Sequence, residues 1–301
     1  MSLLVTGSIG LDTIETPHGR AQDVLGGSSV YFSLAAVLFN EVRLVGVVGE
    51  DFDLGLLEPL KARGVDTRGI EVRKGSRTFR WHGRYNESMN DRETVRVELN
   101  VLAEHPAPVP PHYADSRYVF LANTHPKLQR VTLAELPNAE LVVCDTMNHW
   151  IESEREELHS TLAAVHGLVL NDVEARLLTG TMNLVTAGRR ILELGPRFVV
   201  IKKGEHGSLL VSRDDLFSLP AYPTERTIDP TGCGDTFAGA MMGYIAQQGR
   251  ENPRTLRAAL ARGTVVASFA LESFSIAALA CVTRADVDER LAELKRIARF
   301  T

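Results

Sequence analysis

The chain has 301 residues, 44% of them hydrophobic, and a formal net charge of −5 at pH 7. Its length suits one large α/β domain or two smaller ones, and its apolar content is ample for a packed core, which excludes a disordered chain. The weak negative charge excludes an overall field that would attract nucleic acid or an anionic membrane, so chemistry on small molecules fits the composition better.

The cysteines and the apolar segments indicate the compartment. Cys144, Cys233 and Cys281 are odd in number and too scattered for a disulfide framework, which favours a reducing environment. The first residues lack the basic segment of a signal peptide. The apolar region 264–282 is interrupted by Glu272 and several serines, so we expect buried helix and strand there rather than a membrane span. The sequence therefore predicts a cytoplasmic protein.

The chain opens with a short apolar run, Leu3-Leu4-Val5-Thr6-Gly7. Such a run predicts a buried strand whose carboxyl end faces a ligand crevice. Asp12 follows closely, and a glycine pair, Gly26-Gly27, precedes a helical pattern that begins near Val30. From the residues alone, Asp12 can be an exposed turn carboxylate and the two glycines an ordinary loop.

Between residues 70 and 102 the periodicity changes. The segments around Phe79-Arg80-Trp81 and Val95-Arg96-Val97 alternate apolar and polar side chains, and residues 86–93 between them are polar. Alternation predicts strands with one face toward solvent.

From residue 118 onward, strand and helix patterns alternate. Short apolar runs predict buried strands at 118–122, 141–144 and 168–170, and helical periodicity predicts helices at about 126–136, 154–164, 254–272 and 284–297. Strand-helix alternation predicts a parallel sheet covered by helices on both faces.

Two of the strands end in polar motifs. Asn171 and Glu174 follow the strand at 168–170 with the spacing of a capping box, in which each side chain bonds the other residue's backbone. The strand at 198–202 ends in Lys202-Lys203 and a Gly-x-x-Gly turn. The lysines put positive charge at the carboxyl edge of the sheet, although one of them can simply be solvated.

The stretch Asp229-Pro230-Thr231-Gly232-Cys233-Gly234-Asp235 comes just before an apolar run at helical spacing. Gly232 and Gly234 can adopt backbone angles closed to other residues, so successive N–H groups can point at one anion, and a helix N-terminus adds favourable potential. Asp235 then lies within reach of a reacting group, or it merely caps the helix. The chain has no Gly-x-x-x-x-Gly-Lys-Ser/Thr motif, and Phe237 stands where a dinucleotide fingerprint needs its third glycine, which disfavours a P-loop protein and a nicotinamide oxidoreductase.

Asp229-x-Thr231-Gly232-x-Gly234-Asp235 resembles the C-terminal signature of the ribokinase (PfkB) family of small-molecule kinases. The Gly-Ser-x-x-x-Asp ending at Asp12, the glycine pair, the Asn-x-x-Glu and the Gly-x-x-Gly follow the family's order, so the resemblance covers essentially the whole chain. It implies an α/β fold: a ribokinase-like, doubly wound, mainly parallel sheet with helices on both faces and a small β-sheet lid. It also implies one kinase domain over residues 1–301, with lid strands inserted at about 12–22 and 70–102.

The resemblance assigns the chemistry to this signature. Asp235 would be the catalytic base that takes the proton from the substrate hydroxyl, and the amides of Gly232, Cys233 and Gly234 would form an anion hole for the transferred phosphoryl group. Cys233 stands where the family usually has alanine. A thiol at a helix N-terminus should have a depressed pKa, so we expect Cys233 to react with alkylating reagents before Cys144 or Cys281, which the pattern places in the core.

The resemblance also implies ATP as the phosphate donor and Mg²⁺ near its phosphates, and it leaves a monovalent cation open. Asn171 and Glu174 would hold the magnesium ion. The nucleotide would lie along Lys202, Lys203, Gly204, Gly207, Thr231, Thr264, Val265 and Ser268.

For the substrate, the resemblance implies that Asp12 and the edge formed by Gly26 and Gly27 bind hydroxyl groups. The inner face of the lid would carry Phe79, Trp81 and Asn100. For the two aromatics, plain lid packing or a homodimer contact through the lid is an equal alternative.

The expected reaction is ATP-dependent phosphorylation of a hydroxymethyl group on a small sugar or ribonucleoside. Strict ribokinases follow the glycine pair with Lys-Gly-Ala-Asn, whereas this chain has Ser28-Ser29-Val30-Tyr31, which disfavours ribose. Phe79, Trp81 and Tyr31 can enclose a base, which favours a nucleoside such as adenosine. A sugar kinase of the fructokinase or ketosugar type, and a non-catalytic ligand-binding protein on the same fold, are the alternatives.

Overall fold

The computed structural model describes residues 2–299, which form two β-sheets. The large sheet has nine strands, in the order β13 (Leu216–Leu219), β12 (Ser208–Ser212), β11 (Phe198–Lys202), β10 (Gly167–Asn171), β9 (Leu141–Asp145), β8 (Tyr118–Leu121), β1 (Leu3–Thr6), β4 (Val42–Gly49) and β5 (Asp66–Arg73). The small sheet has four strands, in the order β3 (Gly19–Gly26), β2 (Gly10–Thr16), β6 (Phe79–Tyr85) and β7 (Arg92–Glu98).

Every neighbouring pair from β11 to β5 is parallel, which confirms the mainly parallel sheet. The edge formed by β11, β12 and β13 is antiparallel. In a parallel sheet all carboxyl ends point to one edge, so the loops that follow these strands gather there and form the usual place for a ligand.

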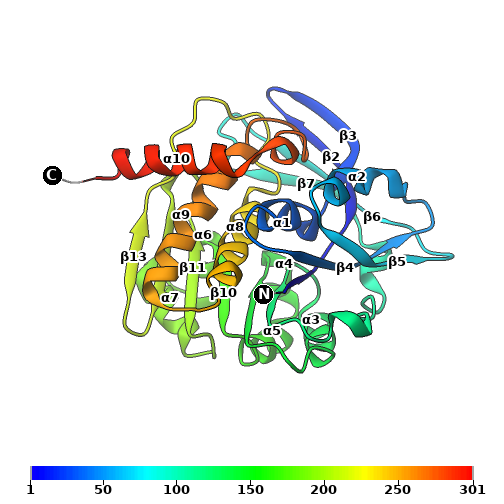
Figure 1. Cartoon of the computed structure of the whole chain (residues 1–301), viewed down its shortest axis with the longest axis horizontal. Helices are drawn as coiled ribbons and strands as arrows, with labels where there is room; N and C mark the ends of the chain where they lie inside the picture. Colours follow the sequence, from blue (N-terminus) through cyan, green and yellow to red (C-terminus); the bar gives the residue numbers. More distant parts are fainter. Residues whose placement is uncertain (1, 300–301) are drawn as a thin grey trace.

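The small sheet confirms the second layer of strands but corrects its bounds. Residues 70–73 belong to β5, which pairs with β4 in the large sheet, so the small-sheet strands occupy residues 10–26 and 79–98. Periodicity places a residue on one face of a strand, but it does not say which sheet the strand joins. In Figure 1, β2, β3, β6 and β7 lie together at the upper right of the large sheet.

Helices cover both faces of the large sheet, as its buried parallel strands require. One core includes side chains of α1 (Ser28–Ala36), α2 (Glu58–Ala62), α8 (Cys233–Gln248), α9 (Pro253–Ala270) and α10 (Arg284–Ile297). The other core lies beneath α3 (Pro126–Ala134), α4 (Asn148–Ser153), α5 (Arg155–Leu162), α6 (Asp172–Thr179) and α7 (Leu184–Leu192). Short 3-10 helices span Leu54–Leu57, Asn100–Ala103, Pro111–Tyr113, Gly204–His206 and Leu279–Cys281.

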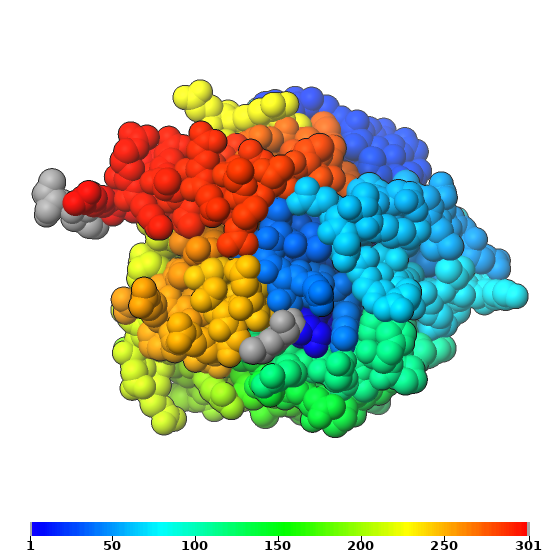
Figure 2. Space-filling view, in the orientation of Figure 1, coloured from blue at the N-terminus to red at the C-terminus, as the bar shows by residue number. Residues whose placement is uncertain are grey.

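Two glycines let α8 pack closely on α1. A Cβ atom at Gly239 would lie 2.2 Å from the carbonyl oxygen of Phe32, and one at Gly243 would lie 2.5 Å from that of Ala36. The contacts advance in the same direction along both helices, so the N-termini of α1 and α8 meet at one place. Figure 2 shows the N-terminal part of the chain, in blue, flanked by the orange and red C-terminal helices.

The apolar region 264–282 does not contain the strand that we expected. It comprises the end of α9, followed within the described residues by turns and a 3-10 helix at Leu279–Cys281. Among residues 2–299, no helix combines the length and the apolar composition that crossing a membrane requires.

Candidate active site

A cavity of about 480 Å³ lies between the small sheet and the loops at the carboxyl edge of the large sheet. Asp12 and Trp81 line it from the small sheet. The loop after β8 lines it with Asn123, the start of α4 with His149, and the start of α8 with Asp235. Residues far apart in the sequence therefore meet at the edge where the parallel strands end.

Asp12 lies in β2 of the small sheet, shortly after the connection that leads from β1. Asp12 is 4% exposed, and its carboxylate packs against Gly26. Burial, followed by the charges of Asp229 and Asp235, raises the pKa of Asp12 to about 7, although a backbone hydrogen bond from Gly27 acts in the opposite direction. The structure thus places Asp12 beside the glycine pair, and it is not an exposed turn residue.

Two serines join this connection to the N-terminus of α1. The backbone N–H of Ser28 donates to Ser8 Oγ at 2.9 Å, and that of Ser8 donates to Ser28 Oγ at 3.2 Å. Ser29 Oγ donates to Ser8 O at 2.7 Å. Ser28 and Ser29, which stand where strict ribokinases have Lys-Gly-Ala-Asn, therefore fix the N-terminus of α1 to the segment around Ser8 by hydrogen bonds.

The turn before α8 is shaped by Asp229, which is 1% exposed. Its carboxylate accepts hydrogen bonds from the backbone N–H groups of Thr231 at 2.8 Å and Ser275 at 3.2 Å. Gly232 has φ +74 and its Cα faces the ring of Tyr31, 2.3 Å from where a Cβ would lie. Both the backbone angle and the close approach require glycine at this position.

Of the three backbone amides expected to bind an anion, one is already hydrogen-bonded within this turn. The Cys233 N–H donates to Pro230 O at 3.2 Å, whereas the Gly232 and Gly234 N–H groups have no acceptor among residues 2–299. The two glycines therefore provide the free donors of the site.

Lys202 approaches the N-terminus of α8 from the end of β11. Its Nζ atom would lie 2.6 Å from a Cβ placed on Gly234. A lysine at the positive end of a helix makes a cationic place that suits an anion. The charge of Lys202 also acts to lower the pKa values of three carboxyl groups, those of Asp235, Glu174 and Asp145.

Asp235 lies at the first turn of α8 and lines the cavity. Burial raises the pKa of its carboxyl group, and Lys202 and Arg92 act against that rise. Asp145, at the end of β9, is 6% exposed and its Oδ1 atom has no hydrogen-bond partner among the described residues. Burial and then the charge of Asp235 raise the pKa of Asp145 well above its ordinary value. Sequence reasoning missed Asp145, although it directly ends a buried parallel strand.

Asn171 and Glu174 form the capping box that their spacing predicts. Asn171 Oδ1 accepts the Glu174 N–H at 2.8 Å, and Glu174 Oε2 accepts the Asn171 N–H at 2.7 Å. Glu174 is nonetheless 6% exposed, and burial raises its pKa. The Glu174 carboxylate has two oxygens, so it can accept the capping hydrogen bond with one and contact a ligand with the other.

Phe79 and Trp81 lie on the inner face of the small sheet and line the cavity, as expected. The Trp81 indole packs against Gly83, where a Cβ atom would lie 1.9 Å from the ring. Asn100 does not join them, because its side chain donates to Thr78 O at 2.8 Å and does not line the cavity. Tyr31 also lines the cavity, but it is 1% exposed and its ring packs against Gly232, so it offers little surface to a base.

Several residues expected to contact the nucleotide lie away from the cavity. Val265 has no exposed surface, and the Ser268 hydroxyl donates to the Val265 carbonyl and accepts from Arg290. Thr264 is 8% exposed within the same helix. Helical periodicity could not show which face of α9 packs inward. Lys203, Gly204 and Gly207 form the turn after β11, closed by the Lys203 N–H donating to Gly207 O at 2.8 Å.

The cavity also contains residues that sequence reasoning missed. From the small sheet these are Tyr85, Arg92, Thr94 and Val97, and from the segments that follow β8 and β9 they are Asn123, Thr124, His125, Met147, and His149 and Trp150 of α4. These segments follow buried strands, so the rule for parallel sheets could have found them.

Two of the expectations for the cysteines are wrong: the depressed pKa of Cys233 and the core position of Cys281. Burial is the largest cause that raises the pKa of the Cys233 thiol, and the neighbouring charges of Asp229 and Asp235 raise it further. Cys144 is buried, but Cys281 is exposed and does not lie in the core.

Solved structures with the same fold are nucleoside and sugar kinases. A nucleoside kinase of Burkholderia thailandensis in complex with inosine matches with a TM-score of 0.80 and 20% identity, over 97% of this chain and 98% of that one. A putative ribokinase II of E. coli in complex with ATP and Mg²⁺ matches with a TM-score of 0.77 and 19% identity, over 97% of this chain and 99% of that one. These likenesses establish the ribokinase fold.

The family follows from the sequence match. The profile of the pfkB family of carbohydrate kinases matches residues 20–280, and the chain belongs to this family. The cytidine kinase of Thermococcus kodakarensis is 29% identical over 259 residues, which cover 84% of this chain and 90% of that protein. Mouse ribokinase is 38% identical over 84 residues, 25% of each chain.

Proposed function

We propose that this protein is an ATP- and Mg²⁺-dependent kinase that phosphorylates the hydroxymethyl group of a ribonucleoside. One observation carries the proposal: a single cavity contains the buried acid Asp12 and the half-buried acid Asp235 together with the aromatic rings of Phe79, Trp81 and Trp150. Carboxylates suit the hydroxyl groups of a sugar, whereas flat apolar rings suit a nucleobase. The cytidine kinase relative and the inosine-bound nucleoside kinase support this substrate class.

In the proposed mechanism, Asp235 accepts the proton of the substrate hydroxyl as that oxygen attacks the γ-phosphorus of ATP. The bond from this phosphorus to the β,γ-bridging oxygen breaks, and ADP leaves. The free N–H groups of Gly232 and Gly234 and the ammonium of Lys202 stabilise the negative charge on the transferred group. Asp12 orients the acceptor through its hydroxyl groups.

The residues at the ends of β9 and β10 fit a magnesium ion. Glu174 uses Oε2 in the capping box, which leaves Oε1, and Asp145 Oδ1 is buried without a partner. Mg²⁺ is usually held by one or two carboxylates together with water and substrate phosphates. Glu174 and Asp145 would hold the ion, with Asn171 fixing Glu174, and the ion would neutralise the ATP phosphates.

A screen of acceptors tests the proposal. ADP release is measured with ATP, Mg²⁺ and a panel of ribonucleosides, ribose and fructose, with and without K⁺, which also tests the monovalent cation. We expect turnover on one or more nucleosides at a kcat/KM well above that for either sugar, and Asp235→Asn should lower it about 10²- to 10⁴-fold. Turnover on fructose or ribose alone would establish the sugar kinase alternative, and binding without turnover would establish the non-catalytic one.

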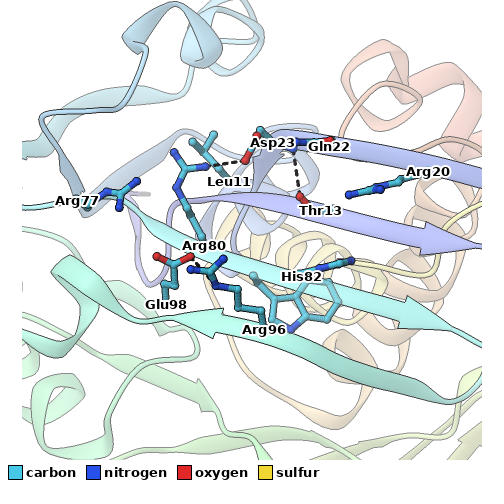
Figure 3. Close-up of a pocket in the computed structure, with 11 residues that line it drawn as sticks. Leu11, Thr13, Arg20, Gln22, Asp23, Arg77, Arg80, His82, Arg96 and Glu98 are labelled. Atoms are coloured by element: carbon cyan, nitrogen blue, oxygen red, sulfur yellow. Dashed lines mark hydrogen bonds and ion pairs between the residues drawn. The ribbon is translucent and has the colours of Figure 1, made fainter.

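We also propose that two copies associate through the outer face of the small sheet. A hollow of about 370 Å³ lies on this face, and Figure 3 shows that acidic and basic side chains, including Asp23, Arg80, Arg96 and Glu98, border it. A surface with both charges can pair with a copy of itself across a two-fold axis. Light scattering should give a dimer mass for the wild type, and a monomer mass at assay concentration would rule the association out.

A further inference from the structure

We propose that Arg92 is a catalytic residue that binds the terminal phosphate of ATP from the small sheet. This inference rests on the proposed function. Arg92 is the first residue of β7 and lines the cavity that contains Asp235. A guanidinium group matches phosphate oxygens with two parallel hydrogen bonds, which a lysine cannot do.

Arg92 differs from the other arginines of the small sheet in having no carboxylate partner. Arg20 and Arg84 pair with Glu15, Arg80 pairs with Asp23, and Arg96 pairs with Glu98. Figure 3 shows Arg20, Arg80 and Arg96 around the outer hollow. For Arg92, no carboxylate oxygen among residues 2–299 lies within 4.0 Å of the guanidinium. An unpaired cation in a cavity is suited to a negatively charged ligand.

A β-bulge directs Arg92 inward. The register between β6 and β7 shifts between His82 and Gly83, so Arg92 is opposite Tyr85 on the inner face while Arg96 is opposite His82 on the outer face. Without the extra residue, Arg92 and Arg96 would share a face, because side chains alternate along a strand. The guanidinium lies 5.9 Å from the centre of the Trp81 ring, which also belongs to the inner face.

The end of the hairpin that carries Arg92 is fixed to the body of the protein on two sides. Tyr85, its partner across the hairpin, accepts a hydrogen bond from Thr231 Oγ1 at 3.2 Å. Asn90 Nδ2 donates to Glu205 Oε1 at 2.9 Å, in the turn that follows β11. These contacts place Arg92 between the turn before α8 and the turn after Lys202.

Arg92 and the proposed base Asp235 line the same cavity. The charge of Arg92 also lowers the pKa of Asp235, although the two side chains form no ion pair. A phosphoryl group passing from ATP to a hydroxyl beside Asp235 would lie between Lys202 and Arg92. Arg92 then compensates charge on the oxygens of that group while the bond to the bridging oxygen breaks.

Binding measured without an acceptor tests the inference. Calorimetry compares ADP with a non-hydrolysable β,γ-imido analogue of ATP, each with Mg²⁺, on the wild type, Arg92→Gln and the control Arg84→Gln. Arg84 lies one row away on the outer face, and Glu15 keeps two other partners without it. We expect Arg92→Gln to weaken the ATP analogue about 10- to 100-fold, with ADP unchanged, because a hydrogen bond to a charged group is worth about 1.5–3 kcal/mol. Arg84→Gln should bind both nucleotides as the wild type does.

Kinetics with the best acceptor supplies the second measurement. We expect kcat to fall about 10²- to 10³-fold in Arg92→Gln. Arg92→Lys should recover part of the rate, because an ammonium group keeps the positive charge but cannot form two parallel hydrogen bonds to the phosphate. The inference is overturned if the two nucleotides are affected alike, or if kcat of Arg92→Gln equals that of Arg84→Gln. A wild type that binds the ATP analogue but phosphorylates no acceptor would defeat the proposed function and leave the calorimetric test of Arg92 intact.

Discussion

The backbone of Gly26 lies directly against the carboxylate of Asp12: a Cβ atom on Gly26 would be 1.9 Å from Oδ2 and 2.4 Å from Cγ of Asp12. Gly26 does not adopt a positive φ, so the contact, and not the backbone conformation, requires glycine at this position. Asp12 is buried and has a defined orientation only because its neighbour has no side chain.

We therefore expect Gly26→Ala to displace the Asp12 carboxylate. A lost hydrogen bond to a charged group should lower kcat/KM for the acceptor roughly 10- to 100-fold, chiefly through KM. Steady-state kinetics checks this expectation, and Gly55→Ala, whose Cβ would lie 3.1 Å from Asp53 Oδ1 away from the cavity, is the control. If Gly26→Ala keeps the KM of the wild type, Asp12 does not orient the acceptor.

The raised pKa of Asp12 makes the stability of the free protein depend on pH. Burial, together with the charges of Asp229 and Asp235, raises the pKa from 3.8 to about 7, so between these values the folded state keeps a proton that the unfolded state has released. The free energy of unfolding contributed by Asp12 therefore falls as pH rises through this window and stays constant above it.

Asp12→Asn should remove this loss. We expect the variant to be more stable than the wild type by roughly 2–4 kcal/mol near pH 8, and the difference to shrink toward zero near pH 4. Denaturant unfolding of the ligand-free proteins at both pH values checks this result. Equal pH dependence of the two proteins would show that Asp12 ionises normally in the folded state.

The residues that the sequence could locate are those fixed by local geometry. Gly232 and Gly27 have positive φ values and begin helices, and the Asn171–Glu174 box depends only on spacing within one turn. Such local features depend on only a few consecutive residues, so the sequence alone can reveal them. Asp12 was found by its motif, but its burial comes from β3, which a pattern within β2 cannot show.

The residues that the sequence could not locate depend on long-range packing. Arg92 faces the cavity because of a single bulge, and the alternation around it gives no sign of the shift. Val265 was expected at the nucleotide, but it lies in the core because α9 packs α8 on that side. Asn100 has the left-handed φ of +47 and bonds Thr78, so its role is in the backbone connection that leaves β7.

Glu174 should show two separable roles. Glu174→Gln keeps a side chain that can complete a capping box, so we expect only a small change in melting temperature. Loss of the carboxylate should raise the Mg²⁺ concentration for half-maximal rate about tenfold or more, since ligand charge contributes strongly to binding a divalent cation.

The control for Glu174 is the second capping box of the chain, formed by Thr283 and Asp286 at the start of α10. Asp286→Asn likewise keeps a side chain that can complete its capping box, so it should change the melting temperature only slightly and leave the Mg²⁺ requirement of the wild type unchanged. A Glu174→Gln variant that loses stability and keeps the Mg²⁺ requirement of the wild type would limit Glu174 to the cap.

The thiols test how burial competes with the helix dipole at the start of α8. A helix N-terminus alone would lower the pKa of Cys233, but burial and the charges of Asp229 and Asp235 raise it, and the thiol donates weakly to Ala267 O at 3.7 Å. Since the thiolate is the reactive form, Cys233 should react slowly with a small alkylating reagent.

We therefore expect the exposed Cys281 to be alkylated first, and Cys233 and the buried Cys144 only much later. Peptide mapping by mass spectrometry over a time course near pH 8 gives the order of labelling. Labelling of Cys281 should leave turnover unchanged, because it lies in the 3-10 helix before α10 and does not line the cavity. Cys233→Ala should retain activity, since a small side chain preserves the turn around Gly232 and Gly234. Rapid inactivation of the wild type that Cys233→Ala abolishes would show instead that the helix N-terminus outweighs burial at Cys233.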